Sequence, residues 1–436
     1  MTRNERVAAW SLGLFAAVMR WPALSLTLWD WDEALFALAL RDYDVTAHHP
    51  HPPGFPLFIA AAKLVPLDAF HALQSVTFIA SLCVFPAMFF LARELRATPF
   101  VAMASALLLA FLPNVWFFGG TAFSDVPSLV LVLVACALLL RGRTRDVSLL
   151  AGAAMLGIAA AVRPQNLLIG FVPFVLAFLQ RRRAAVVGGC LIALILVASF
   201  GTAAAASGGW DAYRETLTRH ERYIREADSF LSPRRPWLPQ VADDFFVRPF
   251  RALPINIALT LLALLGLRRT PWIALAMFGP FLLFAWLYLD FHSASRFSIG
   301  YMPLFALLAA EGIPSRGRTI TLGALTVLLV AWSWPALRVV HTTPSPTFAA
   351  MQSIDAPLDA PLIYVDERLA AHAELLLPHV QRQLVRVTPQ LELPRGSILI
   401  KEGASLAPGA TNFTRTRDRL EGIARPRYFE VSVIRR

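Results

Sequence analysis

Three carboxylates stand together where the first apolar segment of the chain ends. The sequence there reads WDWDEALFALAL and contains Asp30, Asp32 and Glu33. Acidic side chains at the exit from a membrane are costly unless water, a metal or a reaction stabilises them. A carboxylate in a partly dry cavity can take a proton from an attacking hydroxyl, and carboxylates also favour the start of a helix. Asp32 and Glu33 are therefore candidates for a general base, and helix capping is the alternative.

Two further candidates follow along the chain, each beside a proline. His51 stands in HHPHPPGFPLF, where two prolines bend the chain sharply, so it either contacts a substrate or metal or lies in an exposed turn. Asp125 stands in SDVP at the start of an apolar run. Ser, Asp and an early Pro are also a good helix start, so capping competes with a binding role for Asp125.

Two isolated arginines complete the set of polar candidates. Arg163 precedes a proline at the end of an apolar run, where it either snorkels to lipid headgroups or binds a substrate. The short turn DFHSASRF contains His292 and Arg296. An arginine that faces the inside of a helical bundle can hold a phosphate through two hydrogen bonds. We therefore treat Arg163, His292 and Arg296 as candidate substrate-binding residues.

The composition predicts a polytopic helical membrane protein. Of 436 residues, 57% are hydrophobic and 16% charged, against about 25% charged in a soluble domain. The formal charge of +11 comes from short basic clusters between the apolar runs, which is the pattern of the positive-inside rule and not that of a nucleic-acid binder. All three cysteines lie within apolar runs, so we expect no disulfide framework.

Apolar runs of about twenty residues are long enough to cross a bilayer. If every basic cluster is cytoplasmic, the N-terminus lies inside, the C-terminus lies outside and the number of spans is odd. We predict eleven spans, at residues 7–27, 70–92, 98–117, 124–140, 147–162, 165–180, 184–206, 252–267, 271–289, 297–311 and 319–335. A shorter apolar stretch at 54–66 is predicted to lie on the membrane surface.

Three segments are predicted to lie outside the membrane on the outer face. Residues 28–69 contain the acidic group, and residues 207–251 begin with an amphipathic helix that has a basic face. Residues 336–436 have a globular composition with alternating strand and helix patterns. We therefore predict a transmembrane domain at 1–335 and a small C-terminal α/β domain at 336–436.

The order of these motifs resembles that of the GT-C glycosyltransferases. The pattern runs from the Asp32-Glu33 pair, through His51-Pro-Pro, Ser-Asp125-x-Pro and Arg163-Pro, to Arg296, which leads into YMPLFALLAAEG. It is closest to the branch of the protein O-mannosyltransferases and the lipid A aminoarabinose transferase. Many relatives have Lys where this chain has His51.

The resemblance implies a polytopic all-α fold and an activity on the outer face of the membrane. A polyprenyl-phosphate-linked sugar would be the donor, and a lipid, glycan or protein hydroxyl would be the acceptor. Asp32 would be the base, with Glu33 beside it, and Arg296 and Arg163 would bind the donor phosphate. Such an activated donor would be attacked by the acceptor hydroxyl with inversion at the sugar carbon.

A transporter or lipid flippase is the alternative class, and a non-catalytic scaffold is a third. Transporters usually place charges within spans and show internal repeats, neither of which the later spans have. No cofactor is required by the motifs, and a divalent metal stays open. The alanine-, arginine- and proline-rich composition is typical of a bacterium of high genomic GC content, which predicts an inner membrane that faces a periplasm. We expect membrane lipids as partners and no nucleic acid.

Overall fold

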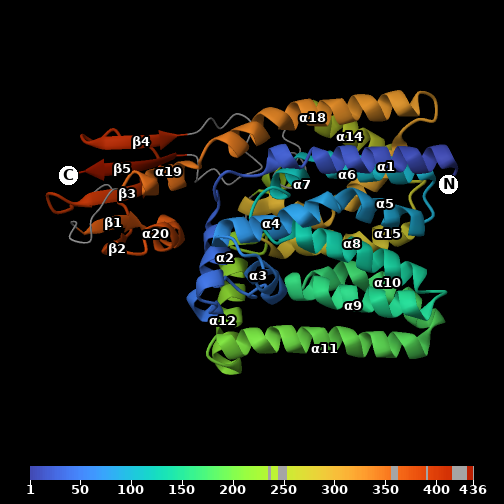
Figure 1. Ribbon diagram of the computed structural model, residues 1–436, viewed down its shortest axis with the longest axis horizontal. Coiled ribbons are helices and arrows are strands. Elements are labelled where there is room, and N and C mark those ends of the chain that lie inside the picture. Colours follow the sequence, from blue (N-terminus) through green and yellow to red (C-terminus); the bar gives the residue numbers. More distant parts are fainter. Residues whose placement is uncertain (234–236, 244–252, 355–361, 389–390, 415–429, 436) are drawn as a thin grey trace.

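The computed structural model describes residues 1–436 except 234–236, 244–252, 355–361, 389–390, 415–429 and 436. A bundle of roughly parallel helices forms most of the molecule, and a small sheet lies at the end away from the N-terminus (Figure 1). The helices are α1 (Arg3–Val18), α2 (Trp31–Arg41), α3 (Pro56–Lys63), α4 (Ala69–Leu82), α5 (Val84–Glu94), α6 (Pro99–Phe111), α7 (Pro113–Phe118), α8 (Asp125–Arg141), α9 (Asp146–Val162), α10 (Asn166–Gln180), α11 (Arg182–Ala206), α12 (Trp210–Tyr223), α13 (Leu238–Ala242), α14 (Leu253–Gly266), α15 (Trp272–Tyr288), α16 (Ala294–Phe297), α17 (Met302–Gly312), α18 (Arg318–Thr342), α19 (Pro346–Gln352) and α20 (Ala370–Leu376).

Each predicted span overlaps a helix or helix pair of the bundle, but the number of spans is not settled by helix length. In the described part of the chain, two helices are long and apolar enough to cross a membrane, α11 and the helix that begins at Arg318. A third counts if α4 and α5, which meet at a 41° bend, form one span. The other apolar helices are shorter. The count of eleven therefore stays a prediction.

Among the described residues, the C-terminal sheet has five strands: β1 (Ile363–Asp366), β2 (Arg382–Val385), β3 (Ile398–Glu402), β4 (Ala410–Thr414) and β5 (Glu430–Arg435). Their order in the sheet is β2-β1-β3-β5-β4. β1 pairs in parallel with β2 and β3, and β5 pairs antiparallel with β3 and β4. The predicted strand-helix alternation is observed, since α20 follows β1 and three more strands come after β2.

α20 attaches the sheet to the bundle by packing against α2. Two apolar side chains of α20, Ala371 and Leu375, belong to the same buried core cluster as the apolar face of α2. Arg41 Nη1 donates a hydrogen bond to the Leu375 carbonyl at 3.2 Å, and His49 Nε2 lies 3.3 Å from Glu374 Oε1. The sheet is therefore fixed against the helix that contains the acidic residues. Figure 1 shows α2, α3 and α12 gathered at this end of the bundle.

Candidate active site

The start of α2 is fixed by its own acidic side chains. Asp30 precedes the helix and accepts a hydrogen bond from the Asp32 N–H at 3.0 Å. Glu33 Oε2 accepts from the N–H groups of Trp29 and Asp30, at 2.6 and 2.9 Å. Glu33 Oε1 accepts from the Ala122 N–H at 2.9 Å. Glu33 is fully buried, so its carboxylate ties α2 to the loop that precedes α8.

Glu33 and Asp32 consequently occupy different surroundings. Burial raises the pKa of Glu33 to about 7 against the opposing effect of its backbone hydrogen bonds. Glu33 does not line either of the two large cavities described below, whereas Asp32 lines one of them. We predicted a catalytic role for both residues. The contacts of Glu33 are those of a residue that positions Asp32.

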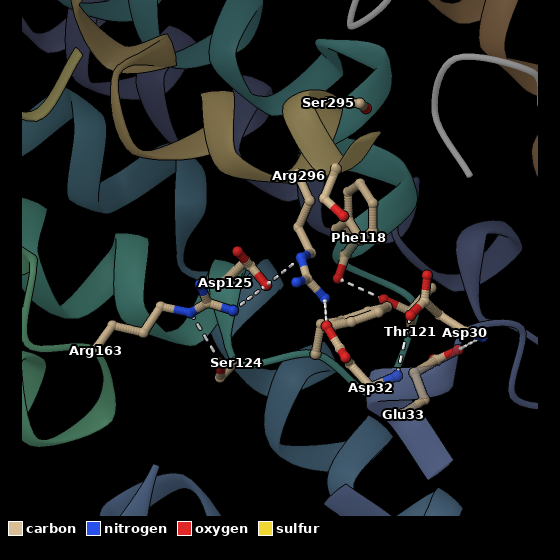
Figure 2. Close-up of polar contacts among 12 residues, drawn as sticks. Asp30, Asp32, Glu33, Phe118, Thr121, Ser124, Asp125, Arg163, Ser295 and Arg296 are labelled. Atoms are coloured by element: carbon tan, nitrogen blue, oxygen red, sulfur yellow. Dashed lines mark hydrogen bonds and ion pairs between the residues drawn. The ribbon is translucent and has the colours of Figure 1, made fainter. Parts of the chain in front are cut away.

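Asp32 forms an ion pair with Arg296 across the bundle. The two atoms in contact are Asp32 Oδ2 and Arg296 Nη1, which lie 2.5 Å apart, and both side chains are buried. The guanidinium also lies over two aromatic rings, 4.7 Å from the centroid of Phe123 and 4.9 Å from that of Phe297. Aromatic faces attract a cation and fix its plane. Figure 2 shows Arg296 pointing between Asp32 and Asp125.

Asp125 forms a second ion pair, with Arg163. Arg163 donates from Nη2 to Asp125 Oδ2 at 2.7 Å and from Nε to Ser124 Oγ at 2.9 Å (Figure 2). Arg163 is buried, so it points into the protein and not toward headgroups. Arg296 Nε lies 4.0 Å from the same Asp125 oxygen. Two carboxylates and two guanidiniums thus alternate in one chain of contacts.

His51 lies beside this chain of charges. Its Nδ1 is 3.8 Å from Asp32 Oδ1. The ring is tilted against Phe36 at a centroid distance of 5.4 Å and makes an edge contact with Phe55 at 4.8 Å. Burial lowers the pKa of His51 to about 3, although the nearby carboxylate of Asp32 raises it. His51 is therefore neutral at physiological pH. His51 therefore lies beside the charged residues of the site, and the prolines that follow it form a turn, as the sequence indicated.

The remaining predicted residue, His292, lies in the turn Phe291–Ser293 that precedes α16. The structure does not describe its side chain. In the same turn, Asp290 accepts a hydrogen bond from Ser293 Oγ at 2.9 Å. Among the described residues, no group of three or more His, Cys, Asp or Glu side chains could hold a metal ion.

Two large cavities meet at these residues. The first, here called the Asp32 cavity, has a volume of about 580 Å³ and includes Asp32, His48 and Arg219 in its lining. The second, here called the Phe284 cavity, has a volume of about 620 Å³, and its lining is rich in apolar side chains of α10 and α15 such as Leu168 and Phe284. The residues common to both are His51, His220, Ile224, Asp290, Arg296 and Phe297. Arg163 lines the Phe284 cavity.

Sequence reasoning missed one contribution to the Asp32 cavity. Arg368, which follows β1, lines this cavity and pairs with Glu402 at 3.0 Å. No local pattern indicated this, because the docking of α20 on α2 brings Arg368 there. The anchoring role of Glu33 did have a signal. Asp30-x-x-Glu33 is the spacing of a capping box, in which the Glu side chain reaches back to the backbone.

The same arrangement of helices occurs in solved structures. ArnT from Cupriavidus metallidurans matches with a TM-score of 0.58 at 14% identity, over 98% of this chain and 98% of that one. A second ArnT structure, bound to undecaprenyl phosphate, matches with 0.58 at 13% identity over 99% and 98%. The archaeal oligosaccharyltransferase AglB from Archaeoglobus fulgidus, in complex with an inhibitory peptide and a dolichol-phosphate, matches with 0.53 at 12% identity over 87% and 65%.

The fold is GT-C-like. The predicted resemblance to this superfamily is confirmed at the level of the fold. No protein-family model matches the sequence, and neither does any curated protein. A GT-C-like fold at this identity does not fix the reaction. The function must therefore be inferred from the two cavities and the charged residues between them.

Proposed function

We propose that the protein is a membrane glycosyltransferase. It transfers a sugar from a polyprenyl-phosphate-linked donor to an acceptor hydroxyl on the outer face of the membrane, with inversion at the sugar carbon. The observation that carries the proposal is Arg296, which is buried, lines both cavities and contacts Asp32. A donor that joins an apolar chain to a polar sugar through a phosphate matches an apolar cavity, a cationic junction and a polar cavity in that order.

In this proposal the donor lipid occupies the Phe284 cavity and its phosphate lies at Arg296 and Arg163. Both cations stabilise the negative charge that grows on the phosphate as the bond to the sugar breaks. The guanidinium of Arg296 exchanges Asp32 for phosphate oxygens, and the aromatic rings of Phe123 and Phe297 keep its plane fixed. Asp125 holds Arg163 in place, and His51 and His292 contact the substrates.

The acceptor hydroxyl is proposed to enter the Asp32 cavity, where Asp32 takes its proton. The acceptor oxygen attacks the sugar carbon, the bond from that carbon to the phosphate oxygen breaks, and the electron pair leaves with the phosphate. The sugar is oxocarbenium-like in the transition state, and a nearby carboxylate favours that positive charge. Undecaprenyl phosphate in ArnT and dolichol-phosphate in AglB support a lipid phosphate as the ligand of this site.

The experiment that tests this function is transfer from a panel of radiolabelled polyprenyl-phosphate sugars. Purified protein is incubated with each donor and with cell-envelope lipids, glycans and proteins as acceptors. We expect a labelled product and free polyprenyl phosphate from at least one donor. Movement of an intact labelled donor across a liposome without any new product would support a flippase and overturn the proposal.

We also propose a topology with a cytoplasmic N-terminus, a transmembrane domain at 1–335 and a periplasmic domain at 336–436, in a bacterial inner membrane. The N-terminus and the C-terminal sheet lie at opposite ends of the molecule, which supports this orientation (Figure 1). A reporter that is active only outside the cytoplasm should be active after residue 436 and silent after Arg183. A silent C-terminal fusion would contradict an odd number of spans.

A further inference from the structure

His51 is held in a turn that three hydrogen bonds keep rigid. Gly54 closes the turn with a hydrogen bond from its N–H to the His51 carbonyl at 3.1 Å. Gly54 has a φ of +99°, and a Cβ there would meet Tyr43 Oη at 2.6 Å. Tyr43 Oη donates to the Gly54 carbonyl at 2.9 Å, and Tyr213 Oη of α12 donates to the Pro53 carbonyl at 2.8 Å. A turn this constrained fixes where the imidazole lies.

One nitrogen of the His51 imidazole has no hydrogen-bond partner among the described residues. Nδ1 is buried and makes no hydrogen bond within the described structure, and the nearest oxygen recorded for it is Asp32 Oδ1 at 3.8 Å. A buried nitrogen without a partner is uncommon and requires a reason. Contacts between catalytic groups are often long in the absence of substrate and shorten when it binds.

Four titratable or charged groups face His51. They are Asp32 of α2, His220 of α12, Arg296 of α16 and Arg163 at the end of α9. Burial, with the charges of the two arginines, keeps the ring neutral before substrate binds, so that Nδ1 can accept a proton. A donor phosphate would offset the positive charges of Arg296 and Arg163, and the imidazolium would then be favoured more than it is in the empty site.

We propose that His51 is a second catalytic residue, which receives from Asp32 the proton that Asp32 takes from the acceptor hydroxyl. This proposal rests on the proposed function. The hydroxyl O–H bond breaks and its proton passes to Asp32, while the acceptor oxygen forms a bond to the sugar carbon. The proton then moves from Asp32 Oδ1 to His51 Nδ1, and the ring releases the proton of Nε2 to water in the cavity. Asp32 ends this step unprotonated and His51 carries its proton on Nδ1; exchange with cavity water, which gives a proton to Nε2 and takes the one on Nδ1, returns the ring to its starting tautomer.

The two oxygens of Asp32 have different neighbours before the donor binds. Oδ2 lies 2.5 Å from Arg296, and Oδ1 faces His51. His51 lines both cavities whereas Asp32 lines only one of the two. A proton on His51 can therefore also reach the Phe284 cavity, which Asp32 does not line. Asp32 is then ready for the next acceptor without having to exchange its proton with water beside a bound product.

The test compares His51→Asn with wild type in the transfer assay. Asn places an amide near the position of Nδ1 but cannot take up a proton. We expect kcat to fall about a hundredfold, the low end of what general acid–base groups contribute, with undecaprenyl phosphate binding within about twofold of wild type, a margin worth less than about 0.5 kcal/mol. His71→Gln, on an exposed face of α4, is the matched control and should leave both quantities unchanged.

A double-mutant cycle separates a relay from two independent effects. Asp32→Asn with His51→Asn should be no slower than Asp32→Asn alone, because residues that act as a unit are not additive. A His51→Asn variant with wild-type kcat, a change confined to donor binding, or additive losses in the double variant would each overturn the relay. If the wild-type protein makes no product with any donor, the proposed function fails instead.

A measurement on the unmodified protein covers the case in which His51→Asn does not fold. The transfer rate is followed in mixtures of H2O and D2O. A curved dependence of kcat on the deuterium fraction, which indicates two protons in motion, supports the relay. A linear dependence indicates a single proton in motion and overturns it.

Discussion

The site contains two buried Asp–Arg pairs that differ in what surrounds the arginine. Arg163 has its Nε on Ser124 and its Nη2 on Asp125, so protein oxygens already occupy one edge of its fork. Arg296 contacts Asp32 through one nitrogen, lies against two aromatic rings and lines both large cavities. The same residue types at the same depth thus serve two purposes. The Arg163 pair joins the end of α9 to the start of α8, and the Arg296 pair is open to exchange.

The largest expected effect on the transfer rate comes from the pair of Asp32 and Arg296. Asp32→Asn removes the proposed base and should slow transfer by about 10²–10⁴-fold. Asn keeps the shape of the side chain, so protein should still be recovered from membranes. The measurement is kcat with a labelled donor, and Asp42→Asn, at the exposed end of the same helix, is the control. Retention of more than about half of the turnover would assign Asp32 a structural role.

Arg296→Lys should have the next largest effect. Lysine keeps the charge but loses the planar fork that grips two phosphate oxygens. A hydrogen bond to a charged group contributes about 1.5–3 kcal/mol, so donor binding should weaken by about tenfold or more. The readout is the Kd for undecaprenyl phosphate. Arg222→Lys, on the exposed face of α12, should change it little, and equal effects at both positions would indicate general attraction to headgroups.

Arg163→Lys should reduce the stability of the protein more than it weakens donor binding, which is the reverse of what we expect for Arg296→Lys. Its main consequence is the loss of the hydrogen bonds to Ser124 and Asp125, which should lower the free energy of unfolding by about 1.5–3 kcal/mol. Donor binding should change less than in Arg296→Lys. Thermal unfolding in detergent measures the first quantity, and Arg182→Lys on the exposed start of α11 is the control. A loss of donor binding as large as that of Arg296→Lys, without loss of stability, would remove the distinction between the pairs.

The smallest effect concerns the pH dependence of stability. Burial raises the pKa of Glu33 to about 7 from an ordinary value of 4.5. The folded state therefore binds this proton more tightly, and the contribution to stability is complete below pH 4.5 and lost as the pH rises to about 7. Glu33→Gln should flatten the decline in melting temperature over this range. Glu367→Gln, at an exposed position, should leave this decline unchanged. If Glu33→Gln also leaves it unchanged, Glu33 is not the source of the pH dependence.

The sequence predicted that four charged residues lie on one face of the membrane, but not how they pair. Asp32, Asp125, Arg163 and Arg296 each stand at the end of an apolar run, and the positive-inside rule places those ends on one face. The partner of each arginine depends on how α8, α9 and α16 are rotated and packed. For that reason, the sequence left headgroup contact open for Arg163, and the structure gives it Ser124 and Asp125.

In the C-terminal sheet, too, the strands could be predicted from the sequence but their packing partners could not. Its strands β1, β3 and β5 follow from alternating apolar residues, which are a local property of the sequence. The position of Arg368 in the wall of the Asp32 cavity follows from the packing of α20 on α2, and residues that far apart carry no local signal of their contact. Glu33 is different, since its anchoring contacts were implicit in the capping-box spacing beside the two tryptophans.

The hydrogen bond between Arg41 and Leu375 joins residues 334 positions apart. During synthesis, α2 leaves the ribosome long before α20 does, and for that period the helix that presents Asp32 lacks the surface that later covers it. The Asp32 cavity gains its last wall residue only when the carboxyl-terminal segment has folded against α2. A ribosome that stops early would thus release a chain with every helix of the bundle but an unfinished cavity, so that the length of the chain itself decides when the site becomes whole.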